Sequence, residues 1–405
     1  MPGIDAALKS ARPRPLAALR RFTGDLANAE DAFQDAAERA LRHWKTNGLP
    51  DNPTAWLITT GRRLLIDQQR RNRFSRPLDQ PPASDFTLTD TSSLDDDLLR
   101  LIFCCCHPAL PETAQVALTL KVIAGLPTEA IAAAFLTATR TMEQRLTRAR
   151  SKIRDSALPY AIPEDHELGE RLAAVLATIY LIFNQGYSGR DASGPERRLC
   201  QEAIWLGRLM LQLFPGNPET AGLLAMMLLH HARHAARQSS TEQVITLNQQ
   251  DRSIWDKKLI REGRALLQHA LDKRVPGPYQ TQAAITALHC EAETQSDTDW
   301  SQIEALYAVL ERQTNNPVVT VNRAVALGMS GQPKAGLELI GALEPQQSLH
   351  RYAPYWLAQA ELHELLNENQ LAQKCLDLAM TLVKNESELE FLRSKSRLLS
   401  SNMGN

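Results

Sequence analysis

The sequence lacks any apolar run long enough to cross a bilayer, and it contains few cysteines. A membrane-spanning helix needs roughly 18 consecutive apolar residues, and the N-terminus also lacks the apolar core of a signal peptide. The 405 residues include 6 cysteines, scattered apart from one adjacent run of three, which is no framework for a disulfide-rich secreted domain. We therefore expect a protein that works in a reducing cytoplasm without a membrane anchor.

Motifs that carry catalysis or hold a cofactor are also missing. The sequence has no glycine-rich phosphate loop, no paired catalytic acids and no nucleophile elbow. Cys104 to Cys106 and His107 lack metal-ligand spacing, and His230, His231 and His234 share a helix without a supporting carboxylate. We expect no catalytic residue, metal or cofactor, because no reactive constellation supports an enzyme pocket near residues 187–191.

The charges divide unevenly along a chain whose length predicts two to four domains. Residues 1–158 contain 22 Lys and Arg against 18 Asp and Glu, whereas the remainder contains 23 against 28. Basic charge provides most of the non-specific affinity for DNA. The front of the chain is only weakly basic, so we expect it to bind DNA with the help of a partner.

Helical periodicity dominates the sequence, and strand-like alternation is almost absent, so the expected fold is all-α. From residue 25 to 44, a predicted helix has a small apolar face of Ala29, Phe33, Ala36, Ala40 and Trp44. Its other side is rich in carboxylates and amides. That side, which holds Asp31, Gln34, Asp35 and Glu38, is either a solvated surface or a binding face, and Glu30 beside it completes the candidate residues of this helix.

A second long helix is predicted to begin at Asn52 and Pro53, with Leu57, Ile58, Gly61, Leu64 and Leu65 on its packing face. Arginines lie opposite this face, and Trp56 lies beside them. Cationic side chains next to an exposed aromatic ring suit a phosphate backbone and an unpaired base, although Trp56 could equally be a core residue. The candidate residues are Trp56, Arg62, Arg63, Arg70, Arg71 and Arg73.

A polar, proline-containing linker is predicted at residues 75–93, followed by a helix from Leu94 and another from Pro111 to about Ile123. Residues 126–154 then have the pattern of a helix-turn-helix, with Thr128 as the expected cap of its first helix.

The second helix of this motif has a narrow apolar stripe of Met142, Leu146, Ala149 and Ile153. Arginine and glutamine on its opposite side have the chemistry to read base edges in a major groove. A solvated amphipathic helix is the alternative. The candidate DNA-reading residues are Thr139, Arg140, Thr141, Gln144, Arg145 and Arg148.

The order of these segments over residues 10–158 resembles the sigma-70 family, specifically its two-domain extracytoplasmic function (ECF) factors. AEDAFQDAAERAL at 29–41 is similar to the helix that grips RNA polymerase, AWLITTGRRLLIDQQRR at 55–71 to the −10 element reader, and residues 127–154 to the −35 element reader. The resemblance implies that the linker threads the RNA-exit path, although a solvated spacer would have the same composition. Leu136, Arg140 and Arg63 depart from the family pattern, so promoter sequence is not transferred.

The chain after about residue 165 resembles the C-terminal extension of one subgroup of these factors, through YLIFNQGYS at 180–188, NQQDRSIWD at 248–256 and NPVVTVNRAVAL at 316–327. Its last part has the pattern of paired helices similar to tetratricopeptide repeats (TPR). Pro317 and Pro354 each open a helix, and Ala335 and Ala372 recur at the same offset in the second helices. Stacked pairs form a concave surface that usually binds a peptide or another domain.

These observations predict a sigma factor with five segments: region 2 at 1–74, the linker at 75–93, region 4 at 94–158, a helical extension at 159–295 and TPR-like repeats at 296–405. Its expected partners are core RNA polymerase and promoter DNA. The alternative is a stand-alone helix-turn-helix regulator with a sensing domain. The extension is expected to regulate in cis, either by covering the arginines or by being required for activity.

Overall fold

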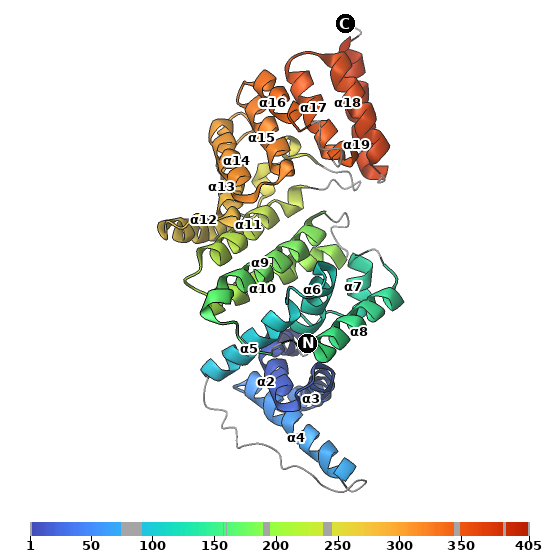
Figure 1. Ribbon diagram of the computed structural model, residues 1–405, viewed down its shortest axis with the longest axis vertical. Coiled ribbons are helices and arrows are strands. Elements are labelled where there is room, and N and C mark those ends of the chain that lie inside the picture. Colours follow the sequence, from blue (N-terminus) through green and yellow to red (C-terminus); the bar gives the residue numbers. More distant parts are fainter. Residues whose placement is uncertain are drawn as a thin grey trace. The chain divides into compact units, whose positions relative to one another are not determined.

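The computed structural model describes residues 2–73, 91–135, 137–156, 158, 160–188, 195–237, 245–343, 349–383 and 386–403. Across these ranges the regular structure is helical and contains no strand, which confirms the all-α prediction (Figure 1). Most of the predicted linker, and residues 189–191 of the region weighed as an enzyme pocket, lie outside these ranges. Contacts group the chain into two compact units, residues 1–189 with 193–206, and residues 190–192 with 207–405.

The first unit begins with α1 (Pro2–Ala11), α2 (Pro13–Thr23), α3 (Leu26–Asn47) and α4 (Pro53–Arg73). Asp25 caps α3 by accepting a 3.0 Å hydrogen bond from the Asn28 amide, and Asn52 caps α4 by accepting one of 3.0 Å from the Ala55 amide. The predicted apolar faces of both long helices are buried, from Ala29 to Trp44 in α3 and from Leu57 to Leu65 in α4. The expected packing is therefore confirmed.

The predicted region 4, called the reader domain below, contains α5 (Thr91–Cys105), α6 (Glu112–Leu118), a π-helical turn η1 (Thr119–Ile123), α7 (Thr128–Ala134) and α8 (Thr139–Asp155). Helices α7 and α8 pack together as the predicted helix-turn-helix, and the apolar stripe of α8 is buried. The expectation that Thr128 caps α7 is wrong. Pro127 occupies the N-cap position without a side-chain hydrogen bond, since its fixed backbone angle already suits that place.

Helix α9 (Asp165–Ser188) belongs to the first unit, although its sequence is part of the predicted extension. Three side chains along α9 form hydrogen bonds to the reader domain. Arg171 donates to the Phe103 carbonyl at 2.7 Å, Thr178 to the Gln115 side chain at 3.2 Å, and Gln185 to the Ala134 carbonyl at 2.8 Å. The first residues of α10 (Pro195–Leu213) complete this unit, and the rest of α10 contributes to the second.

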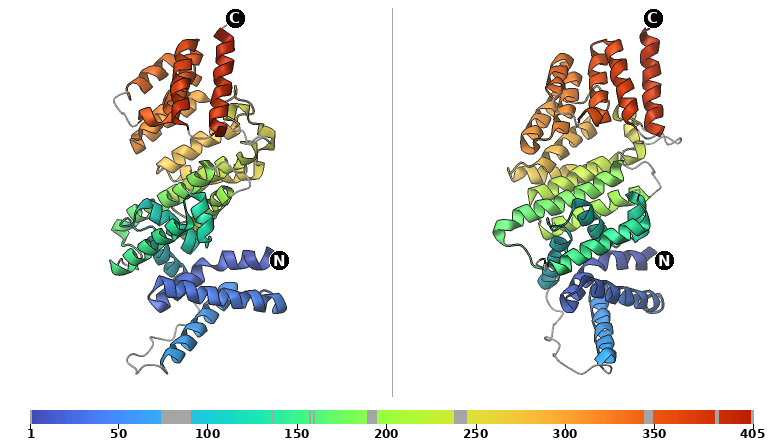
Figure 2. Two further views of the ribbon diagram at one scale, coloured as in Figure 1. Left: turned by 90° about the vertical axis from the view of Figure 1, so that its right-hand side faces the viewer. Right: turned by 45° about the vertical axis from the view of Figure 1, so that its right-hand side comes forward.

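The second unit consists of consecutive helices, most of which pack on the next in the chain (Figures 1 and 2). After α10 come α11 (Pro218–Ala232), the 3₁₀ turns η2 (His234–Ala236), η3 (Leu247–Gln249) and η4 (Arg252–Ile254), then α12 (Lys257–Asp272), α13 (Pro278–Glu291) and α14 (Trp300–Thr314). The last part contains α15 (Pro317–Met329), α16 (Pro333–Gly341), the 3₁₀ turn η5 (Leu349–Arg351), α17 (Ala353–Leu365), α18 (Asn369–Leu382) and α19 (Glu386–Met403).

The predicted helix pairs are present as α15 with α16 and α17 with α18. Asn316 caps α15 by accepting a 3.0 Å hydrogen bond from the Val318 amide. The first pair shares a core with α17 of the second pair, and this core includes Ala324, Ile340, Tyr355 and Leu362. A pair alone would leave one apolar face uncovered, so stacking of successive pairs is what stabilises this part of the chain.

Gly336 lies where α16 packs closely against α15. A Cβ atom at this position would lie 2.6 Å from the Ala324 carbonyl oxygen and 2.8 Å from Leu362 Cδ2, and the carbonyl cannot move without the helix. We expect Gly336→Ala to lower the free energy of unfolding by about 1–3 kcal/mol through overpacking. Urea unfolding of the full chain, followed by circular dichroism, measures this loss.

Gly341 provides the matched control, because it lies on the same helix and a Cβ there would meet nothing within 4 Å. Gly341→Ala should leave stability unchanged or raise it slightly. Equal effects of the two substitutions would contradict the close packing at Gly336.

Candidate nucleic-acid interface

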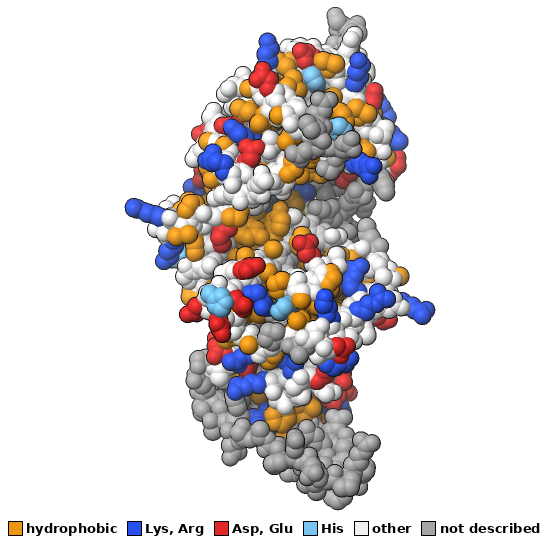
Figure 3. Space-filling model, viewed as in Figure 1, with side chains coloured by type: hydrophobic (Ala, Val, Ile, Leu, Met, Phe, Trp, Pro, Cys, Tyr) orange, Lys and Arg blue, Asp and Glu red, His pale blue; other side chains and the backbone are white. Residues whose placement is uncertain are grey.

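Helix α8 buries one side and exposes the other, as its sequence predicts. Arg140, Thr141, Gln144 and Arg148 are exposed, while Thr139 and Arg145 are half-buried at the edge. Figure 3 shows Lys and Arg side chains on the surface over α8. This exposed side combines arginines, which can bond guanine, with a glutamine, which can bond adenine. It has the shape and chemistry to enter a major groove.

The acidic side of α3 is exposed at Asp31, Gln34, Asp35 and Glu38. Glu38 forms a 3.0 Å ion pair with Arg42 one turn later, which contributes little at such exposure. The carboxylates of Asp31 and Asp35 stand on the same exposed side. These four residues are available to a partner with basic groups.

Glu30, the fifth candidate residue of α3, is only 6% exposed. Its carboxylate accepts a 2.8 Å charged hydrogen bond from Arg150 of α8. The negative charge of Glu30 also raises the pKa of Arg12 and Lys121, opposing the larger lowering that burial causes in both. Glu30 therefore lies within a cluster of cations at the joint between α3 and the reader domain.

Arg12 crosses this joint from the region 2 side. Its side chain donates to the Val122 carbonyl at 3.3 Å and to the Lys121 carbonyl at 3.5 Å, and its guanidinium lies 4.8 Å from the centre of the Phe33 ring. Gly125 has φ +73°, and a Cβ there would lie 2.7 Å from Arg12 Cδ. The absence of a side chain at Gly125 is what gives Arg12 its path.

A second set of contacts joins α2 to α5. Arg14 pairs with Asp95 at 2.8 Å, and Arg21 approaches Asp97 at 3.5 Å. Asp97 is 1% exposed, and burial raises the pKa of its carboxyl against the opposing influence of Arg21 and Arg100. These ion pairs connect the two predicted sigma regions directly.

Tyr160 braces the same joint from the segment between α8 and α9. Its hydroxyl donates towards two carbonyl oxygens, of Ala17 in α2 and Asp97 in α5, each at 3.4 Å. Arg20 lies 4.6 Å from the centre of its ring, and burial raises the pKa of the phenol. Helices α1 to α9 therefore form one closed body in which both predicted DNA-reading regions are in contact.

Two of the candidate DNA-binding side chains of helix α4, Trp56 and Arg62, are less exposed than the sequence suggests. Trp56 is half-buried and packs edge-on against Trp44 with 5.4 Å between ring centres. Arg62 is half-buried over Phe22 at 5.0 Å, and Arg63 is exposed. The side chains of Arg70, Arg71 and Arg73 lie outside the described residues.

The three adjacent thiols are core residues. Cys104, Cys105 and Cys106 are each at most 3% exposed, and burial raises all three thiol pKa values, that of Cys104 to about 11. Cys106 Sγ lies 3.4 Å from the Thr119 hydroxyl. Within the described ranges no three His, Cys, Asp or Glu residues gather as metal ligands, and no helix is long and apolar enough to cross a membrane.

The sequence was sufficient to predict the buried and exposed sides of the helices, but not the contacts between region 2 and the reader domain. Neither Arg12 nor Tyr160 stands out by periodicity, because each acts through carbonyl groups more than 60 positions away in the chain. Arg12 stands in the run Ala11-Arg12-Pro13-Arg14-Pro15, and nothing local distinguishes it from Arg14.

Three family models match parts of the chain. Sigma-70 region 2 matches residues 8–75, and Sigma-70 region 4 matches residues 101–153. A family of unknown function (DUF6596) matches residues 171–271, which begin in α9. No solved structure matches the chain.

Comparison with curated proteins agrees with these models. The chain is 43% identical to uncharacterized protein R00370 of Rhizobium meliloti (strain 1021), covering 96% of this chain and 94% of that protein. It is 31% identical to the probable ECF RNA polymerase sigma factor SigI of Mycobacterium tuberculosis over 37% of this chain and 54% of that protein. It is also 44% identical to the ECF RNA polymerase sigma factor SigL of Mycobacterium tuberculosis over 13% of this chain and 31% of that protein.

Proposed function

The chain belongs to the sigma-70 family as an ECF sigma factor with a helical C-terminal extension, and we propose that the extension regulates promoter binding in cis by keeping its two DNA-reading regions closed. As a sigma factor it is a transcription initiation factor and not an enzyme. It binds core RNA polymerase and promoter DNA, and its place of work is the cytoplasm, where that polymerase acts.

The exposed side of α8 is the proposed −35 reader. Gln144 lies between Arg140 and Arg148 on the exposed side of a helix whose other side is fixed in the core. A recognition helix held in this way places its polar side chains against base edges, and flanking cations hold the phosphates. Thr139, Thr141 and Arg145 are the remaining residues of this proposed surface.

The exposed carboxylates of α3 are the proposed contact with core polymerase, through Asp31, Gln34, Asp35 and Glu38. Complementary charge across an interface steers association and fixes register. Glu30 would join this contact only after it leaves Arg150. In the closed body one of the five polymerase-binding residues is therefore occupied.

Helix α4 is the proposed −10 reader, in which Arg62, Arg63, Arg70, Arg71 and Arg73 hold the phosphates of the melted strand. Trp56 would offer its remaining exposed surface to an unpaired base, since a ring already packed on Trp44 keeps a fixed orientation. The exposed Arg63 is the most direct of these contacts.

The closed body does not fit both promoter elements at once. Elements at −10 and −35 are separated by about 25 base pairs, which span roughly 85 Å at 3.4 Å per pair. Here α4 packs on α3, and α3 is tied to α8 by the Glu30–Arg150 pair. Packed helices lie about 8–10 Å apart, so the two readers are too close together and must separate before both can bind.

Elements that follow the reader helix hold the body closed. Tyr160 bridges α2 and α5, α9 hydrogen bonds to three levels of the reader domain, and Glu202 of α10 pairs with Lys9 of α1. The outer side of α8 stays exposed, which favours closure over direct covering of the reader. The single observation that carries this proposal is the contact of both sigma regions with the start of the extension.

Charge reversal on α3 tests the polymerase contact. Asp31→Lys with Asp35→Lys should abolish assembly with core polymerase while the helical content is unchanged, because both side chains are exposed. Co-purification with core enzyme and circular dichroism give the two readings. Asp5→Lys with Asp51→Lys is the control of equal charge change at exposed positions, and equal loss in both variants would exclude a specific role for α3.

Selection from a randomised promoter library tests the reader. Gln144→Ala and Arg148→Ala should change which bases are preferred near −35, because each removes hydrogen bonds to base edges worth about 1–3 kcal/mol. Arg63→Ala should instead weaken all promoters alike and reduce the salt dependence of binding. Unchanged base preference in the α8 variants would remove these residues from the reading surface.

Opening of the closed body is tested at the contact between α1 and α10. Lys9→Glu places a negative charge against Glu202, which is 5% exposed. We expect the repulsion to open the closed body, so that sigma regions 2 and 4 separate and transcription with core polymerase rises several-fold. Small-angle scattering should show a larger radius of gyration. Point variants are preferable to truncation after Asp155, which would also remove α9 from the core of the reader domain.

Two further variants separate this mechanism from a general charge effect. Ser10→Glu adds negative charge at an exposed neighbouring position and should change neither the transcription rate nor the radius of gyration. Lys9→Glu combined with Glu202→Lys should restore closure. If Lys9→Glu has the size and activity of the parent protein, the extension does not regulate through this contact.

A further inference from the structure

The second unit contains a cavity of about 880 Å³ that the proposed function does not use. Helices α13, α14, α15, α17 and α19 contribute to its walls together with the segment from Ile245 to Arg252. Ligand-binding cavities in proteins usually measure about 300–1,000 Å³ and combine apolar walls with a few polar groups. Val325, Met329, Leu357 and Phe391 supply the apolar wall here.

Glu361 of α17 brings an uncompensated carboxylate to this cavity. Within the described part of the chain, no hydrogen bond or ion pair of its side chain is present, whereas the neighbouring Glu364 pairs with Lys395 at 3.1 Å. Burial raises the pKa of Glu361, and Glu364 adds to the rise while Lys395 opposes it. At this end of the cavity a single lysine thus faces two carboxylates, and its ion pair is with Glu364 and not with Glu361.

Over the whole wall three carboxylates, Glu361, Glu364 and Glu390, balance three cations, Arg252, Lys395 and Arg397, but the cations are not placed against Glu361. Arg252 donates to the carbonyl oxygens of His289 and Ala292 at 2.7 and 2.6 Å. Glu390 and Arg397 are exposed on α19 and have opposite charges. Among the described residues Glu361 is therefore a carboxylate of the wall without a direct ion pair, although the wall as a whole is neutral.

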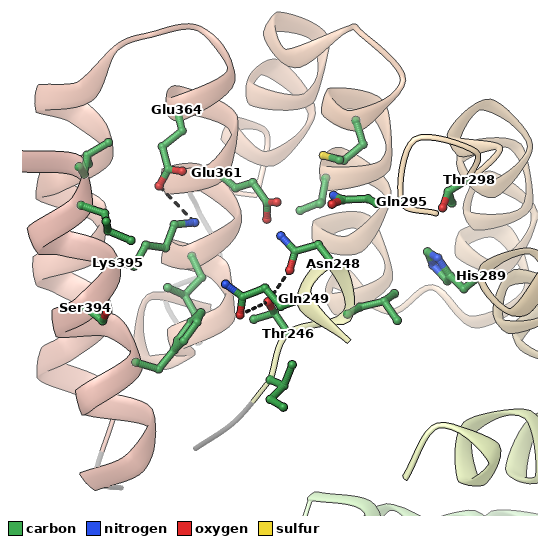
Figure 4. A pocket seen from close by; sticks show the side chains of 18 of the residues that line it. Thr246, Asn248, Gln249, His289, Gln295, Thr298, Glu361, Glu364, Ser394 and Lys395 are labelled. Atoms are coloured by element: carbon green, nitrogen blue, oxygen red, sulfur yellow. Dashed lines mark hydrogen bonds and ion pairs between the residues drawn. The ribbon is translucent and has the colours of Figure 1, made fainter. Parts of the chain in front are cut away.

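The opposite end of the cavity has neutral polar groups without partners. Thr298 is 6% exposed, and its hydroxyl makes no hydrogen bond. Nδ1 of His289 also lacks a partner, and burial lowers the pKa of this imidazole to about 4, so it is uncharged at neutral pH. Figure 4 shows Thr298 and His289 at one side of the cavity and Glu361, Glu364 and Lys395 at the other.

Amide side chains lie between these two ends. The carbonyl oxygens of Asn248 and Gln249 accept hydrogen bonds from Thr246, at 3.1 Å in the case of Gln249. This leaves their NH₂ groups as donors, and Figure 4 shows both amides between Thr246 and Glu361. A ligand in the cavity would therefore meet a carboxylate, then amide donors, then a hydroxyl and a neutral imidazole.

We propose that this cavity binds an organic cation, an ammonium or guanidinium group on an apolar stem, with Glu361 as the residue that receives the cationic group. A half-buried carboxylate without a partner has lost part of its hydration, and a ligand cation would offset that loss. The apolar wall accepts the stem, and Thr298 and His289 bond neutral polar groups at the far end. The cation has two chemical sources, a free amine or a Lys or Arg side chain in a peptide.

Isothermal titration of the full-length protein distinguishes these sources. The free-ligand probes are n-hexylammonium and n-butylguanidinium, with 1-hexanol as the uncharged match. The peptide probes are a pool of acetylated, amidated tetrapeptides with one Lys or Arg and a matched pool with norleucine. We expect the charged member of at least one pair to bind at least tenfold more tightly than its neutral match.

Glu361→Gln should remove this preference, and the exposed carboxylate variant Glu338→Gln on α16 should retain it. Preference in the free-ligand pair identifies a small amine as the source, and preference in the peptides alone identifies a basic peptide. The comparison of charged with neutral probes on the unaltered protein holds even if Glu361→Gln fails to fold. Equal binding of charged and neutral probes, or no binding of any probe at 10-fold molar excess and millimolar concentration, would overturn the proposal. Because these readings involve neither polymerase nor DNA, they stand apart from the proposed function.

Discussion

A buried group of charges at the joint of the two sigma regions is the interaction on which the closed body depends. Glu30 is surrounded by Arg150, Arg12 and Lys121, which come from three different parts of the first unit. Charges removed from water are stable only while they stay paired, so this joint favours a fully formed or a fully separated arrangement over intermediate ones. In the separated arrangement, water or a basic surface of polymerase would replace Arg150 as the partner of Glu30. Under the proposed function, the same carboxylate serves either closure or polymerase binding, but not both together.

The sequence was sufficient to predict those features that depend on local periodicity. The apolar stripes of α3, α4 and α8, and the helix pairs opened by Pro317 and Pro354, follow from which residues share one side of a helix. Trp56 shows where this reasoning stops, because its place beside the arginines did not decide between stacking and packing on Trp44. The cap of α7 was mispredicted since proline and threonine both favour helix starts, and only the backbone distinguishes them.

Long-range contacts could not be predicted from one sequence, and they change how the chain divides. The predicted boundary at residue 158 follows composition, and it stays a prediction. By contacts, α9 belongs with the reader domain, where Thr178 reaches Gln115 and Gln185 reaches Ala134. The region that resembles an appended domain is thus in part a structural component of the DNA-binding unit. The proposed regulation in cis needs no flexible tether, because the extension already contributes to the closed body.

Under the two proposals, a ligand in the second unit would act on the opening through helix α10, because the residues of this helix are divided between the two units. Its first part supplies Glu202 to the closed body, and its last part supplies Arg208, which pairs with Glu262 of α12 at 2.9 Å. A ligand shifts an equilibrium only by the difference in its affinity for the two states, and changing the ratio from 1:99 to 99:1 needs a difference of about 10⁴-fold. Every residue proposed to bind a cation lies in the second unit, so a ligand that leaves α10 unchanged would stabilise that unit without altering promoter binding. Control of transcription through the cavity therefore requires that α10 differ between the liganded and the free protein.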